Sequence, residues 1–136
     1  MKLMPYSLGV LPLTLLALLA PSSAAVPAAH RHTASDIGRF LTEFYGDHGP
    51  SADDREGRVS QVLKDRQREN PDADVLLCAQ NEPQHIVIGP VTVAQSAGVG
   101  WATVTTHWNT DTIDTFTAYV RLDSHPIRLD DVICAG

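Results

Sequence analysis

The chain has 136 residues, 43% of them hydrophobic and 19% charged, and its formal net charge at pH 7 is −6. This length supports one domain with a hydrophobic core rather than two. The acidic balance excludes a protein that binds nucleic acid along the phosphate backbone, because such binding depends on clustered Lys and Arg.

The N-terminus has the parts of a secretory signal peptide. Lys2 supplies a positive charge, residues 7–20 form an uncharged and mainly apolar run, and small residues follow at 22–25. The run is about fourteen residues long, shorter than the roughly twenty apolar residues that cross a bilayer. We therefore expect residues 1–25 to be removed. The remaining protein would start near Val26, be secreted to the periplasm or the cell exterior, and have no contact with a membrane.

The chain has two cysteines, Cys78 and Cys134. In an oxidising compartment two cysteines allow one intramolecular pairing. Neither has a His or Lys close to it in the sequence that would activate a thiol, and no paired Cys/His spacing typical of zinc is present. We therefore predict a structural disulfide between Cys78 and Cys134, and neither a metal site nor a cofactor.

After a leader over residues 26–34, expected to be flexible, the sequence predicts one domain over residues 35–136. Its first helix would begin after Ser35 as N-cap and end at Gly46. Apolar residues recur along one face of this helix at the spacing of helical turns: Ile37, Phe40, Leu41, Phe44 and Tyr45.

A second helix is predicted from Ser51 to the Asn70-Pro71 pair, since Pro disfavours helical backbone in the residue before it. Its many arginines are interpreted as a solvated face with ion pairs between successive turns.

From residue 84 onward the apolar period changes from helical to two, which predicts strands. The first predicted strand is interrupted or bent at Gly89-Pro90. Three more follow, with turn residues between them, which favours an antiparallel meander. The four predicted strands lie within residues 85–96, 100–110, 114–123 and 126–136.

Helices followed by strands predict the α+β class, with the N-terminal helices packed on one face of a curved antiparallel four-stranded sheet. The Cys78–Cys134 disulfide would then join the helical half to the last strand.

This layout resembles the cystatin-like cone, also called the nuclear transport factor 2-like fold, and in particular bacterial exported domains of unknown function in that superfamily. The resemblance depends on three segments: "IGRFLTEFYGDH", "DADVLLCAQNEP" and the terminal "IRLDDVICAG" with its Asp131-Val132 pair. It implies a sheet wrapped around helices, with or without an interior pocket.

Alternation places Trp101, His107 and Tyr119 on one face of the sheet, opposite the helices if Trp108 faces them. An exposed aromatic patch of this kind is typical of a contact with a protein or a small ligand. Our first hypothesis is therefore a secreted, non-catalytic binding module that uses these three residues. A homodimer formed through the same face is an alternative.

Enzymes on this fold, such as ketosteroid isomerases and related cyclases, place an acid/base carboxyl and a phenol in the cone's pocket. The resemblance makes Tyr45, Asp47 and Asp114 the candidates for that role, and an isomerase or cyclase type of pocket enzyme is the second hypothesis. A secreted inhibitor is the third. No nucleophile elbow or phosphate-binding loop is present.

Overall fold

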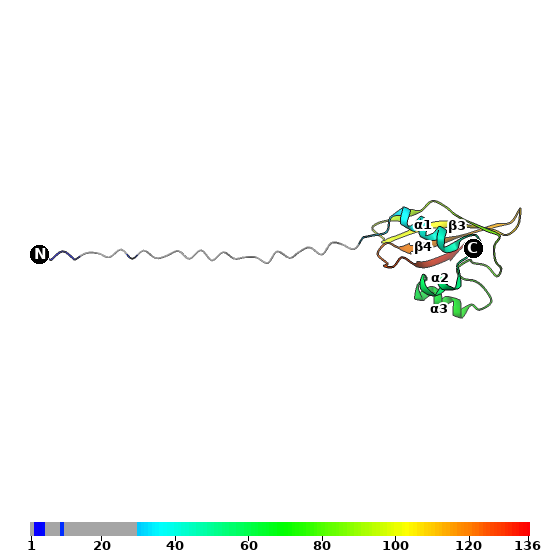
Figure 1. The fold of residues 1–136 in the computed structure, drawn as a ribbon, viewed down its shortest axis with the longest axis horizontal. Coiled ribbons are helices and arrows are strands. Elements are labelled where there is room, and N and C mark those ends of the chain that lie inside the picture. The colour runs from blue at the N-terminus through cyan, green and yellow to red at the C-terminus, as the bar shows by residue number, and fades with distance from the viewer. Residues whose placement is uncertain (1, 5–8, 10–29) are drawn as a thin grey trace.

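The structure is a computed structural model that describes residues 2–4, 9 and 30–136 (Figure 1). Most of the predicted signal peptide, and its cleavage site near Val26, lie outside the described residues. The described chain belongs to the predicted α+β class, with three helices and one open antiparallel sheet of five strands. None of its helices is long and apolar enough to cross a membrane.

Three helices precede all of the strands, and the strands then follow one another to the C-terminus. The helices are α1 (Ala34–Tyr45), α2 (Ala52–Gly57) and α3 (Gln61–Glu69), and the strands are β1 (His85–Ile88), β2 (Thr92–Ala94), β3 (Val99–His107), β4 (Ile113–Arg121) and β5 (Leu129–Cys134). The sheet order is β1-β3-β4-β5, and β2 also pairs with β3.

The sheet has five strands where the sequence predicted four, because the first predicted strand is divided into β1 and β2. The division falls at Gly89-Pro90, where proline lacks the backbone N–H that a ladder requires. Gly89 still donates its N–H to Thr103, so both pieces follow the same edge of β3.

Helix α1 is closed at both ends by side-chain and backbone caps. Its N-cap is Thr33, two residues before the predicted Ser35, and Thr33 and Asp36 form a reciprocal capping box. Gly46 ends the helix with φ +52°, a backbone conformation that glycine adopts without steric cost.

The second predicted helix is two helices, α2 and α3. Residues 58–60 leave the helical conformation because they reach the edge of β5: Leu129 donates its N–H to the Arg58 carbonyl, and Ser60 donates to the Leu129 carbonyl. Ser60 then starts a new helix as the N-cap of α3, with its hydroxyl accepting from Leu63. The pairing with β5 is a tertiary contact that the helical pattern of the sequence does not encode.

The core lies between the helices and one face of the sheet, here called the inner face. Helix α1 contributes all five apolar residues that the sequence predicted for it. The inner face contributes alternate residues of β3 and β4, all buried: Ala102, Val104, Thr106, Phe116, Ala118 and Val120. A Cβ at Gly100 would lie 2.5 Å from Cδ1 of Ile37, so glycine there permits the close approach of α1 to β3.

Buried and exposed side chains do not alternate regularly along β5, because its register with β4 shifts between Tyr119 and Val120. This β-bulge turns both Leu129 and Val132 toward the core, whereas Ile133 is 54% exposed.

The predicted disulfide between Cys78 and Cys134 is present, with 5.7 Å between the two Cα atoms. It ties residues 70–84, which contain no helix or strand, to the last strand of the sheet. Cys78 has φ +52°, the left-handed region that non-glycine residues rarely adopt. The covalent bond therefore holds a backbone conformation that the residue itself disfavours.

The described end of the predicted leader, residues 30–33, makes specific contacts with the domain. His32 donates its backbone N–H to Leu122, its ring lies 4.8 Å from the ring of His125, and Arg31 donates to Gln95.

We predict that the double variant Cys78→Ser/Cys134→Ser loses about 4 kcal/mol of unfolding free energy in the chain-entropy model, because an open chain gains conformations when unfolded. Urea unfolding followed by circular dichroism measures the change. The matched variant Cys78→Gly/Cys134→Ser should recover about 1 kcal/mol, because glycine tolerates the positive φ. Equal urea midpoints for the native protein and both variants would contradict the structural role of the disulfide.

Candidate functional site: the outer face of the sheet

The face of the sheet opposite the helices, here called the outer face, is not covered by any described helix. Antiparallel pairing aligns its residues in rows across the strands. One row contains Thr92, Trp101, Tyr119 and Asp131; the row at the opposite end contains His85, His107 and Ile113.

Trp101 and Tyr119 are directly opposite each other on β3 and β4, and their rings lie 6.0 Å apart between centroids at a tilt of 34°. Both side chains are half-buried. Such cross-strand aromatic pairs stabilise a sheet and also present a rigid, partly apolar surface to a partner.

Between the aromatic row and the histidine row the outer face carries threonines and a few aliphatic side chains. The described domain (30–136) has four exposed large hydrophobic residues, and three of them lie on this face: Val87, Ile113 and Ile133. The fourth, Val62, is on α3. The threonines between the two rows are Thr103, Thr105, Thr115 and Thr117.

Charged groups on the outer face lie at its border and are neutralised there by ion pairs. Asp131 forms an ion pair with Arg66 of α3 at 3.0 Å, and Arg121 donates to Asp123 at 3.3 Å. The hydrogen bond and charge of Arg121 lower the pKa of the Asp123 carboxyl, which therefore stays ionised beside the arginine. The middle of the face is thus uncharged in a protein whose net charge is −6.

The structure places the predicted binding residues Trp101, His107 and Tyr119 on this face. It places Trp101 directly opposite Tyr119. His107 lies three rows further along β3 than Trp101, at the other end of the face. His107 is instead opposite His85 of β1, with 5.7 Å between the ring centroids. Nδ1 of His85 lies 3.0 Å from a carboxylate oxygen of Asp47.

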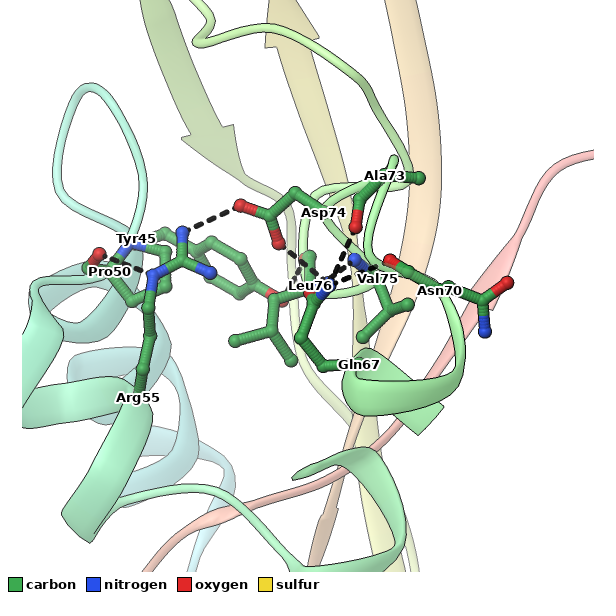
Figure 2. Close-up of polar contacts among 9 residues, drawn as sticks. All are labelled: Tyr45, Pro50, Arg55, Gln67, Asn70, Ala73, Asp74, Val75 and Leu76. Atoms are coloured by element: carbon green, nitrogen blue, oxygen red, sulfur yellow. Dashed lines mark hydrogen bonds and ion pairs between the residues drawn. The ribbon is translucent and has the colours of Figure 1, made fainter. Parts of the chain in front are cut away.

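The three candidates for an enzyme pocket occupy separate places. Tyr45 is fully buried, and its hydroxyl donates to the Leu76 carbonyl at 3.0 Å (Figure 2). Asp47 is exposed and contacts His85. Asp114 is exposed near the end of β4, where its backbone carbonyl accepts from Thr106. No hydrogen bond joins any two of the three side chains in the described structure.

Tyr45 belongs to a polar network that fixes residues 70–79 against the helices (Figure 2). Arg55 of α2 donates to Asp74 at 2.7 Å, and the other oxygen of that carboxylate accepts from the Leu76 N–H. Gln67 of α3 donates to the Asn70 and Ala73 carbonyls and accepts from Val75. Because these bonds satisfy the backbone of a segment without regular structure, the network is structural.

Burial raises the pKa of the Tyr45 hydroxyl well above its ordinary value near 10, and the nearby Asp74 carboxylate raises it further. The phenol is therefore a stable hydrogen-bond donor to the backbone at neutral pH.

The concave parts of the described surface lie away from the outer face. A groove of about 510 Å³ runs between α2 and α3, with Val59, Leu63 and Leu76 among its apolar lining residues. A smaller hollow of about 360 Å³ lies beside Cys78, with Trp108 and Asp114 in its wall. Nε1 of Trp108 is buried there without a hydrogen-bond partner in the described chain.

No protein-family model matches this chain, and no curated protein or solved structure is significantly similar to it. The physical properties of the site therefore carry the functional argument.

Two groupings in the structure were missed by sequence reasoning. The network of Arg55, Gln67 and Asp74 joins residues up to nineteen positions apart across a segment without periodicity, so no local pattern marks it. The pairing of His85 with His107 could have been found, because both occupy outward positions of predicted strands. It required the register between those strands, which the turn at Gly89-Pro90 obscures.

We predict that Tyr45→Phe lowers the unfolding free energy by about 1–2 kcal/mol at neutral pH, because the buried Leu76 carbonyl loses its donor. A phenol whose pKa is raised by folding stabilises the native state fully below its unfolded pKa, and this contribution is lost as the pH rises above about 10. Urea unfolding at pH 7 to 11 should therefore show a flatter alkaline decline for Tyr45→Phe than for the native protein.

The matched control is Tyr119→Phe, which removes the hydroxyl of a half-buried tyrosine on the outer face and should keep the native alkaline decline. Parallel declines for the native protein and Tyr45→Phe would show that the Tyr45 phenol does not couple folding to pH.

Proposed function

We propose that the protein is a small exported binding module without catalytic activity, and that the outer face of its sheet contacts a protein partner. The partner we propose presents a flat, mainly uncharged surface, such as another β-sheet. The observation that carries this proposal is the concentration of exposed apolar and half-buried aromatic side chains on an uncovered face whose centre has no charge.

Charge favours this face over the rest of the surface. The chain has a net charge of −6, so most of its surface repels other acidic proteins. The centre of the outer face avoids that repulsion, since its charged residues are at the border and paired with opposite charges. Depletion of charge with enrichment of aromatic residues is the composition of an interface core.

The shape of the face supports a macromolecular partner over a small ligand. Small-ligand sites are concave, whereas the described hollows are lined by residues other than Trp101, His107 and Tyr119. With strands about 4.8 Å apart and a rise of about 3.3 Å per residue, the five strands project an area of roughly 500 Å². This projected area is smaller than the roughly 800 Å² that one partner contributes to a standard interface, and suits a small interface.

The absence of catalysis is proposed from the surroundings of the acidic residues. Within residues 30–136 no Asp or Glu is buried, and the buried polar residues are Ser60, Thr106 and Ser124. An acid/base carboxyl with a pKa near neutrality usually requires burial in an apolar pocket. The Tyr45 phenol is also engaged with the Leu76 carbonyl. A secreted inhibitor remains a special case of the proposal, in which the protein partner is an enzyme.

We also propose that the domain is a cystatin-like cone of the nuclear transport factor 2-like superfamily. The helices-first order and the β-bulge in β5, which adds curvature to a sheet, support this proposal. An experimental structure with a flat sheet would argue against it.

Export is part of the proposal and has its own test. The protein expressed in a bacterium with its full N-terminus should be recovered outside the cytoplasm, and N-terminal sequencing should begin near Val26. The apolar run and the small residues at 22–25 support this expectation. Recovery of the intact chain from the cytoplasm, still beginning with residues 1–25, would refute export.

Photo-crosslinking from the centre of the outer face tests the binding surface. A photoreactive benzoylphenylalanine at Thr117 should form a specific crosslink in the culture fluid of the source cells, and the same group at Val62 on α3 should not. Excess native protein should compete with the crosslink. The double variant Trp101→Ala/Tyr119→Ala should compete at least about 30-fold less well, because central aromatic residues contribute 2 kcal/mol or more to an interface.

The outcomes separate the possible partners. The proposal is supported if Thr117 crosslinks to a different protein, and if excess native protein abolishes this crosslink whereas the double variant does not. Crosslinked dimers formed by purified protein alone would show that the face binds a second copy instead. No competable crosslink from Thr117, with melting curves showing that all variants fold, would refute the proposal.

A further inference from the structure

Two histidines are directly opposite each other at one end of the outer face. His85 on β1 pairs with His107 on β3, so their side chains emerge on the same face of the sheet. His85 is exposed and His107 half-buried, and the ring centroids are 5.7 Å apart at a tilt of 41°. The two imidazoles are thus close to each other and open to solvent.

Their separation suits two ligands of one metal ion. Imidazole nitrogens bind Zn²⁺ at about 2.1 Å, so two rings that share an ion have centroids roughly 4.6–5.7 Å apart at N–metal–N angles of about 90–120°. The observed 5.7 Å lies within this range. Adjacent strands of the same sheet hold both Cα atoms, so little backbone rearrangement is needed for joint binding.

Asp47 orients one of the two rings. A carboxylate oxygen lies 3.0 Å from Nδ1 of His85. Because an ionised carboxylate only accepts hydrogen bonds, Nδ1 must carry the hydrogen, and in the neutral ring Nε2 then has a free lone pair. Carboxylate–histidine–metal arrangements of this kind fix the tautomer and increase the basicity of the ligating nitrogen.

We propose that His85 and His107 together bind one divalent transition-metal ion through an imidazole nitrogen each, with Asp47 as the residue that positions His85. In the described residues no three or more His, Cys, Asp or Glu side chains are arranged to hold a metal ion. The pair therefore supplies two ligands, and water supplies the others. Imidazole suits Zn²⁺, Ni²⁺ and Cu²⁺, and Cu²⁺ binds most strongly in this series.

The other close histidine pair is a weaker candidate. His32 and His125 have centroids 4.8 Å apart, but a ring nitrogen of His32 already bonds to the Ser124 carbonyl. In the described structure neither of these two rings contacts a carboxylate. The metal proposal depends only on the geometry of the histidine row, so it is independent of the proposed protein partner.

Cu²⁺ binding to the oxidised protein tests the site, with electron paramagnetic resonance as the readout. We expect one tightly bound Cu²⁺ ion per chain, with a resonance signal modulated by the nitrogen nuclei of two imidazole ligands. His85→Ala and His107→Ala should each leave one imidazole and weaken binding more than tenfold. Asp47→Asn should keep both imidazoles and weaken binding about 10- to 100-fold, as the loss of an orienting carboxylate does in other sites.

The double variant His30→Ala/His32→Ala is the matched control, because it removes the histidines near the N-terminus and should leave the signal unchanged. Loss of the ion in this control, or an unchanged imidazole count and affinity in His85→Ala and His107→Ala, would overturn the proposal. An unchanged affinity in Asp47→Asn would overturn the positioning role of Asp47. Melting curves check that each variant is folded.

Discussion

The structure depends on packing the apolar face of α1 against one face of the sheet. Ile37, Phe40, Leu41, Phe44 and Tyr45 are all buried there. A sheet of this size needs one covered face to bury its apolar residues, and α1 and α3 supply that cover from the same side. The opposite face consequently remains open, and it carries both the aromatic pair and the histidine pair.

The helices α2 and α3 bury few apolar side chains of their own, and the segment after them is held both by burial of Leu76 and Leu77 and by polar and covalent contacts. Among the residues of α2 and α3, Leu63 alone is buried. Bonds from Arg55, Gln67 and Tyr45, together with the Cys78–Cys134 disulfide, keep residues 70–79 in place. The polar residues that could suggest a reactive centre in this region are therefore committed to the fold.

The open face combines two chemistries at its two ends. The Trp101–Tyr119 pair provides a rigid aromatic surface. The His85–His107 pair provides imidazole nitrogens that can bind a metal ion, beside the Asp47 carboxylate. Threonines separate these ends and leave the middle of the face uncharged. One surface can thus hold a protein contact and a separate ion site, since each uses different residues.

The sequence alone determined what local periodicity and composition encode: the apolar stripe of α1, the alternation of β3 and β4, and the pairing of the two cysteines. Tertiary structure decided the division of the predicted second helix at Val59, because the backbone on either side of Val59 hydrogen-bonds to Leu129 of β5 instead of continuing the helix. It also decided the register that brings His85 opposite His107 and the separation of Tyr45, Asp47 and Asp114. Local patterns fix which face a residue occupies, whereas distances between segments depend on how those segments pack.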